Sequence, residues 1–173
     1  MGGMTLASRV FAASYLTGTF VLRSGRTADR YFDKYRFESD PSLLAAIVEE
    51  LIPLVPPGTD GLAGLELGGV PIATLLSAKT GLPTFFVRKQ AKKYGTEKLC
   101  EGGDIGGLRL LMVEDVVTTG GQILLSAQDL RAEGAVVTDA LCVIDREAGG
   151  ADRVRAEGIE LHSLFTMSDL ELP

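Results

Sequence analysis

Two acidic residues, Glu114 and Asp115, follow an apolar run and precede a loop of threonine and glycine in the stretch LLMVEDVVTTGGQ, residues 110–122. Glycines that lead into a helix let successive backbone N–H groups converge on one anion, so this loop is suited to a phosphate. Carboxylates repel phosphate, but they accept hydrogen bonds from sugar hydroxyls and from water around Mg²⁺. The stretch therefore predicts a cradle for ribose 5-phosphate. The simpler interpretation is a strand end followed by a glycine turn.

Other phosphate-binding loops do not match this stretch. It lacks the Gly-Lys-Ser/Thr sequence of a Walker loop, and its glycines do not follow the GxGxxG spacing of a dinucleotide-binding loop. Cys100 and Cys142 are far apart and His162 is the only histidine, so neither a disulfide scaffold nor a zinc site is expected.

The overall composition narrows the possible partners. A net charge of −6 argues against nonspecific binding to nucleic acid, which needs an extended basic surface. No apolar run is long enough to span a membrane, and the N-terminus does not have the layout of a signal peptide. We therefore expect a cytoplasmic protein with no nucleic-acid or membrane partner.

The elements that would position the cradle alternate between strand and helix. Apolar runs predict strands at 61–67, 84–88, 108–113, 136–145 and 161–166. Helices are predicted at 5–14, from Asp40 and Pro41 to the VPPG segment, at 71–79, at about 121–133 and near 152–157. Two further strands are expected around the turn-prone SGRTAD segment, residues 24–29.

This alternation indicates right-handed crossovers and an α/β fold with a central, mainly parallel sheet flanked by helices. The length of 173 residues is typical of a single domain, 1–173. Ligands of such sheets lie beyond the carboxyl ends of the strands, which is where we expect the acidic pair to lie.

Two further segments could contact anions. Positive charge is concentrated at the start of a polar insert, 89–107, by Arg88, Lys89, Lys92 and Lys93, and glycines flank the segment. Beside a phosphate cradle the insert predicts a clamp for pyrophosphate, although alone such a segment is more typical of a solvated loop. Gly68 and Gly69 predict either a second nest for anionic oxygens or a plain turn between strand and helix.

Several segments together resemble a known family. VEDVVTTGG (113–121) resembles the phosphoribosyl-diphosphate (PRPP) motif of type I phosphoribosyltransferases. Four further segments resemble one branch of that family, the orotate phosphoribosyltransferases. They are FVLRSGRTADRYFDKY (20–35), LELGGVPIA (65–73), FFVRKQAKKYGTEKLCEGG (85–103) and VIDREAGG (143–150). The resemblance implies a type I phosphoribosyltransferase-like fold with a small N-terminal hood, formed largely by residues 1–37. It also implies Mg²⁺-dependent transfer of ribose 5-phosphate from PRPP to orotate, a step of pyrimidine biosynthesis.

The resemblance also assigns residues to each substrate. The implied PRPP site comprises Arg88, Lys89, Lys92, Tyr94, Glu114, Asp115, Val116, Val117, Thr118, Thr119, Gly120, Gly121, Gln122, Gly68 and Gly69. The implied orotate site comprises Arg23, Tyr31, Phe32, Thr118 and Arg146. Lys92, Glu114 and Asp115 would be the catalytic residues, and Mg²⁺ would be held mainly through PRPP and water, with no direct protein ligand. The forked donors of an arginine such as Arg146 suit a planar anionic ring.

Two positions depart from the pattern of the family. Some members have a histidine where Tyr94 stands, which leaves Lys92 as the proton donor or charge neutraliser. Others have a lysine where Gly68 stands, which leaves backbone N–H groups to bind pyrophosphate. Tyr31 and Phe32, without the resemblance, are typical of packing aromatics.

The resemblance further implies a homodimer in which the insert of one subunit reaches the active site of the other. Three alternatives remain open at this point. The chain could be a phosphoribosyltransferase for another base, a regulator that senses PRPP, or an inactive interaction domain.

Overall fold

A six-stranded sheet forms the centre of the computed structural model, which describes residues 4–22, 24–91 and 99–170. The strand order is β5 (Cys100–Glu101), β4 (Thr84–Val87), β3 (Gly61–Leu65), β6 (Arg109–Val117), β7 (Val136–Asp145) and β8 (Glu160–Thr166). Five of these strands, β4, β3, β6, β7 and β8, run parallel to one another. The edge strand β5 pairs antiparallel with β4. The predicted α/β fold with a mainly parallel sheet is confirmed.

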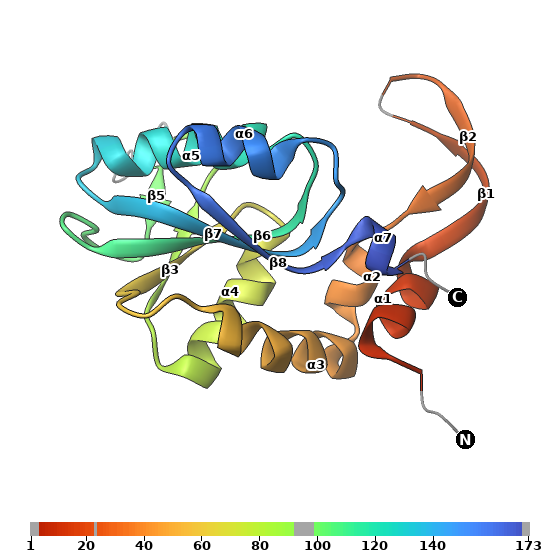
Figure 1. Ribbon diagram of the computed structural model, residues 1–173, viewed down its shortest axis with the longest axis horizontal. Helices are drawn as coiled ribbons and strands as arrows, with labels where there is room; N and C mark the ends of the chain where they lie inside the picture. The colour runs from red at the N-terminus through yellow and green to blue at the C-terminus, as the bar shows by residue number, and fades with distance from the viewer. Residues whose placement is uncertain (1–3, 23, 92–98, 171–173) are drawn as a thin grey trace.

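Helices cover both faces of this sheet (Figure 1). Helices α5 (Gly121–Ala132) and α6 (Gly150–Ala156) lie on one face, and α3 (Pro41–Leu51) and α4 (Gly69–Thr80) lie on the other. Asp40 caps α3 as predicted, since its side chain accepts hydrogen bonds from the backbone of Ser42 and Leu43. Among the described residues, no helix has both the length and the apolar character to cross a bilayer.

Strand β6 directs its side chains alternately to the two faces of the sheet. Leu110 and Met112 join the core on the side of α5 and α6, whereas Leu111 and Val113 join the core on the side of α3 and α4. The sequence predicted a strand end at Val113, but β6 continues to Val117 because its last residues pair with the end of β7. The acidic pair therefore lies inside the strand, and we expect its two side chains to face opposite sides.

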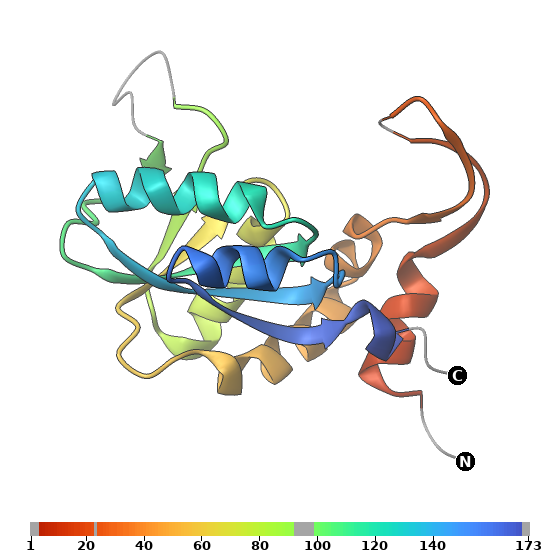
Figure 2. The ribbon, with the colours of Figure 1, turned by 45° about the horizontal axis from the view of Figure 1, so that its top comes forward.

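The N-terminal segment forms a hairpin beside the sheet. Helix α1 (Leu6–Ser14) leads into β1 (Tyr15–Val21), which pairs antiparallel with β2 (Thr27–Phe32). The hairpin stands on the side of the molecule toward which β6, β7 and β8 point (Figure 2). The two strands predicted around SGRTAD are confirmed. The assignment of residues 1–37 to a hood within a single domain stays a prediction.

A 3-10 turn, η1 (Ile52–Leu54), follows α3 within the segment predicted as a helix up to VPPG. Three short elements are missing from the sequence-based prediction: α2 (Tyr35–Ser39), β5 and α7 (Met167–Leu170). None is long enough to display apolar periodicity. The prediction of a wholly polar insert at 89–107 is wrong for its second half, because Cys100 pairs with β4 and both Cys100 and Ile105 are buried in the core. Helix α6 also begins earlier than predicted, after Gly149 in the left-handed region.

Candidate active site

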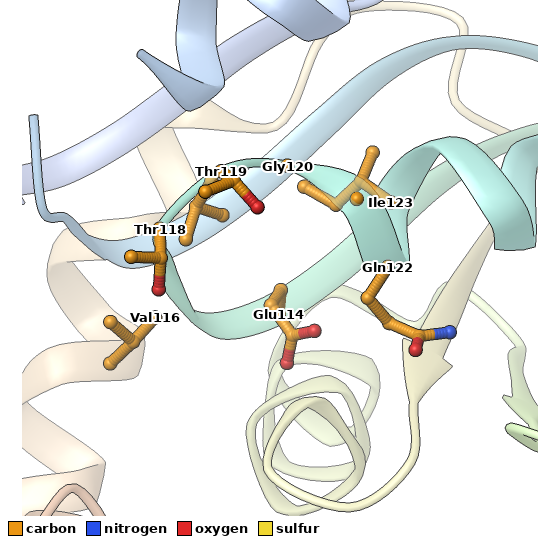
Figure 3. A pocket seen from close by; sticks show the side chains of 9 residues that line it. Glu114, Val116, Thr118, Thr119, Gly120, Gln122 and Ile123 are labelled. Carbon is orange, nitrogen blue, oxygen red and sulfur yellow. The ribbon is translucent and has the colours of Figure 1, made fainter. Parts of the chain in front are cut away.

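The loop between β6 and α5 encloses a pocket of about 150 Å³ at the carboxyl end of the sheet (Figure 3). The pocket is lined by Glu114, Val116, Val117, Thr118, Thr119, Gly120, Gly121, Gln122 and Ile123. Gly120 has a φ of +73° and is the N-cap of α5, a conformation that glycine adopts without strain. The first N–H groups of α5 have no partner within the helix, and the helix dipole favours a negative charge at this end. The pocket can therefore bind a phosphate.

The neighbouring turn, between β7 and α6, supports this loop from behind. A Cβ atom at Gly150 would lie 2.6 Å from the carbonyl oxygen of Thr118, so only glycine allows the two turns to touch. The backbone N–H of Arg146 donates to the carbonyl oxygen of Val117 at 2.9 Å. These contacts bring Arg146, the arginine implied for orotate, next to the loop that forms the cradle.

Glu114 is the acidic residue that lines the pocket. Its side chain is buried, and its Oε1 atom accepts a hydrogen bond from the backbone N–H of Asp115 at 3.1 Å. Burial, and next the adjacent Asp115, raise the pKa of Glu114 to about 8. A glutamic acid that is neutral at pH 7 does not repel a phosphate, and it can both donate to and accept from a sugar hydroxyl.

Asp115 is not among the residues that line the pocket. It is completely buried; its Oδ1 accepts from the N–H of Val116 at 2.6 Å, and Lys34 Nζ lies 2.7 Å from its Oδ2. Because Oδ2 has no aligned hydrogen-bond donor among the described residues, the Lys34 contact is best described as an ion pair. Burial acts to raise the pKa of Asp115, but interactions with Glu38, Lys34 and Glu114 together lower it. Asp115 is therefore the ionised member of this group.

The turn between β3 and α4 is filled by atoms of the protein. A Cβ atom at Gly68 would overlap the carboxylate of Asp115, and one at Gly69 would overlap the carbonyl oxygen of Val113. The space beside Gly68 thus already holds an anionic group. Binding of pyrophosphate to this turn stays a prediction.

Of the predicted cations, the described Arg88 and Lys89 do not line the pocket of the cradle. Arg88 pairs with Glu101 at 3.2 Å and lines a separate hollow of about 460 Å³ beside β4. The backbone N–H of Lys89 donates to Glu66 Oε2 at 2.9 Å. Lys92 and Tyr94 lie outside the described residues, as does Arg23 of the hood. The contacts of these residues with substrate stay predictions.

Of the other residues implied for orotate, Tyr31 and Phe32 pack against neighbouring side chains, and Thr118 and Arg146 are exposed. The ring of Tyr31 stacks on Phe20 with 5.5 Å between centroids, and Tyr31 remains 45% exposed. Phe32 packs against the core on the side of α3 and α4, as expected of a packing aromatic. Thr118 and Arg146 are exposed at the carboxyl end of the sheet, where a ligand could reach them.

Two residues that interact with Asp115, Lys34 and Glu38, were not predicted from the sequence. Glu38 lies in α2 and is 8% exposed; burial, and next Asp115, raise its pKa to about 9. A lysine and a glutamate four residues apart in DKYRFES (33–39) would share one face of a helix, which was the available signal. The segment is too short to reveal that helix by its apolar pattern.

Comparison with known proteins places the chain in a family. It is 50% identical over 167 residues to the orotate phosphoribosyltransferase of a Nocardioides species, covering 96% of this chain and 93% of that protein. The chain belongs to the orotate phosphoribosyltransferase family. No protein-family model matches the chain.

Solved structures of orotate phosphoribosyltransferases agree with the fold. The enzyme of Mycobacterium tuberculosis H37Rv in complex with Fe(III) dicitrate superposes with a TM-score of 0.86 at 35% identity, covering 96% of this chain and 97% of that one. The same enzyme in complex with PRPP superposes with a TM-score of 0.81 at 32% identity and the same coverage. The resemblance seen in the sequence is confirmed at the level of the family and its fold.

Proposed function

We propose that this chain transfers ribose 5-phosphate from PRPP to N1 of orotate, yielding orotidine 5′-monophosphate and pyrophosphate. The observation that carries this proposal is the glycine-lined pocket after β6, in a chain related to an enzyme that binds PRPP. Thr118 and Thr119, with the N–H groups that begin α5, would hold the 5-phosphate. Glu114 would hold the ribose hydroxyls.

The chemistry requires positioning and electrostatic stabilisation more than proton transfer. The bond from C1′ of the ribose to the diphosphate oxygen breaks and its electron pair leaves with pyrophosphate. N1 of orotate supplies the electron pair of the new bond, and its proton passes to the departing pyrophosphate. Positive charge develops on the ribose ring, as in glycoside chemistry, so hydrogen-bond acceptors beside the ring, such as the carboxyl oxygens of Glu114, are favourable. Arg146 would pair with the anionic orotate, and Lys92 would neutralise the departing pyrophosphate.

Mg²⁺ is the cofactor that this reaction implies. Within the described part of the chain, no group of three or more His, Cys, Asp or Glu side chains could hold a metal ion. Among the described acidic residues, Glu114 alone lines the pocket, which suits an ion that arrives on PRPP and meets the protein through water. When bound, the ion would offset the negative charge of the diphosphate.

The loss of orotate absorbance in the presence of PRPP and Mg²⁺ tests the assignment. Orotate should be consumed far faster than uracil, because uracil lacks the carboxylate that an arginine can recognise. Comparable use of uracil, adenine or hypoxanthine would favour a phosphoribosyltransferase for another base. Binding of PRPP without turnover of any base would favour the regulator.

We also infer a homodimer whose active sites are shared between subunits. Proteins carrying Glu114→Ala and Lys92→Ala should each be inactive, but a mixed dimer would contain one intact site if Lys92 acts in the partner's site. Random exchange makes half of the dimers mixed, so activity should recover to about a quarter of the wild-type value. If exchange is verified and activity does not recover, Lys92 acts within its own chain and sites are not shared.

A further inference from the structure

Lys34 links the N-terminal hairpin to the strand that carries the acidic pair. It follows β2 and is the N-cap residue of α2. Its Nζ atom lies 2.7 Å from Asp115 Oδ2; the lysine side chain is 35% exposed and the aspartate side chain is fully buried. An ammonium group that still reaches solvent thus neutralises a carboxylate that does not.

Asp115 is confined on its other sides as well. Val116 N–H donates to Oδ1, and the backbone at Gly68 approaches the carboxylate so closely that no Cβ atom fits between them. The N–H of Asp115 in turn donates to Glu114 Oε1. A chain of contacts therefore runs from Lys34 through Asp115 to Glu114, which lines the pocket.

The charges around Asp115 make Lys34 necessary. Lys34 contacts Asp115 at 2.7 Å, and its charge also acts on the carboxyl groups of Glu38 and Glu114. The pKa values of Glu38 and Glu114 are raised by burial, so these two side chains are neutral at pH 7, whereas the pKa of Asp115 is lowered. Without Lys34 an ionised, buried carboxylate would lose its counterion, a state that is strongly disfavoured.

We propose that Lys34 is a positioning residue for phosphoribosyl transfer: by holding Asp115 it orients Glu114 toward the ribose, and it couples the hood to the PRPP pocket. The inference rests on the proposed function, because it assigns Glu114 to the ribose of PRPP. Lys34 acts through Asp115 and needs no contact with substrate of its own.

The first test compares Lys34→Met, which keeps the length of the side chain but removes its charge, with Lys34→Arg, which keeps the charge. We expect Lys34→Met to raise the Kd and KM for PRPP roughly tenfold, with a smaller change in kcat, and Lys34→Arg to restore most of the affinity. Lys79→Met is the matched control, since Lys79 pairs with Glu49 at 2.6 Å on the exposed surface. Lys79→Met should bind PRPP as the wild type does. Equal PRPP affinity in Lys34→Met and Lys79→Met would overturn the proposal.

A double-variant cycle provides the second test. Asp115→Asn removes the charge that Lys34 neutralises, so Lys34→Met should cost little further PRPP affinity in that background. The same cycle applies if Lys34→Met alone does not fold, because Lys34→Met combined with Asp115→Asn should then fold again. Independent, additive losses in the cycle, or a double variant that stays unfolded, would contradict an action through Asp115.

Failure of this inference can be told apart from failure of the proposed function. If wild-type protein neither binds PRPP in a calorimeter nor consumes orotate, the proposed function is wrong. If the wild type is active and Lys34→Met binds PRPP with unchanged affinity, the proposed function stands and the role of Lys34 is wrong.

Discussion

Two glycine-containing turns follow the neighbouring strands β3 and β6, and the protein uses them in different ways. In the turn after β3, the positions that side chains would take at Gly68 and Gly69 are filled by Asp115 and Val113. In the turn after β6, a Cβ atom at Gly120 would meet Val154 at 2.7 Å, but the space at Gly121 is open and borders a pocket of about 150 Å³. Glycine serves close packing throughout the first turn, whereas in the second turn Gly121 leaves room for a ligand.

The difference shows that glycine at a helix start does not by itself identify an anion site. Gly69 and Gly121 are both the first residues of their helices, α4 and α5. A Cβ atom at Gly121 would meet no atom closer than 3.8 Å, whereas one at Gly69 would overlap a backbone oxygen. What lies opposite the glycine decides its role, and that depends on the fold.

The largest expected effect is on the free energy of unfolding, which should respond differently to alanine substitutions in the two turns. Gly69→Ala should lower the free energy of unfolding by about 3 kcal/mol, because the backbone of β6 must move to admit a methyl group. Gly121→Ala should change it by no more than about 0.5 kcal/mol, since the position is open. Denaturant unfolding followed by circular dichroism measures both. Similar losses in the two variants would mean that the turns do not differ as described.

The next effect concerns ligand binding at the second turn. Thr119 lines the pocket, and Thr119→Val should weaken PRPP binding about tenfold while the melting temperature stays unchanged, because a hydrogen bond to a charged phosphate is lost. Thr74→Val is the control: Thr74 donates to the carbonyl oxygen of Val70 in α4, behind the first turn. Isothermal titration with PRPP should show no change for Thr74→Val. A loss of affinity in both variants would argue against a phosphate site confined to the second turn.

The strands and helices that carry the two turns could be predicted from the sequence, but the difference between the turns could not. Strands such as β7 are nearly continuous apolar runs, and Asp40 with Pro41 marks the start of α3, so local signals suffice for them. The pocket also lies at the loop that the threonines and glycines indicated, although its ligand stays a prediction.

Contacts between distant segments could not be read in the same way. Whether β6 ends at Val113 or continues depends on its pairing with β7, and this places the acidic pair inside the strand instead of after it. The contact between Lys34 and Asp115 joins two distant parts of the chain. The spacing of Lys34 and Glu38 indicates a shared helix face, but it does not indicate that this face meets Asp115.

A third effect tests the charges on the buried side of β6. Glu38, with a pKa near 9 in the folded protein, holds its proton more tightly when folded. Its contribution to the free energy of unfolding is complete below the ordinary pKa of glutamate and is lost as the pH rises toward 9. The wild type should therefore lose stability between pH 7 and 9, by at most about 1.4 kcal/mol per pH unit for this one proton.

Glu38→Gln cannot lose a proton, so its stability should fall less steeply over the same range. Asp115 contributes in the opposite direction and only in acid, because its pKa is lowered. Melting temperatures recorded from pH 6 to 9 measure the slope, with Glu49→Gln as a control on the exposed surface. If Glu38→Gln and the wild type have the same slope, Glu38 does not hold the proton.

The smallest effect concerns the turn after β7, which packs against the pocket loop and also carries Arg146. Gly150 packs against the loop of the pocket, while Arg146 is exposed toward the expected orotate site. Glu147, with a φ of +56°, fixes this turn to α7, because its Oε2 accepts from the N–H of Ser168 at 2.9 Å and from its hydroxyl at 2.5 Å.

Ser168→Ala removes the hydrogen bond from the Ser168 hydroxyl to Glu147 but keeps the one from the backbone N–H. We expect the KM for orotate to rise about two- to threefold, the amount that one exposed hydrogen bond can supply. The Kd for PRPP should not change, since the contact of Gly150 with the pocket loop remains, and Ser168→Thr, which keeps the hydroxyl, should keep the wild-type KM. If Ser168→Ala weakens PRPP and orotate equally, the turn supports the phosphate cradle as a whole and not the position of Arg146 in particular.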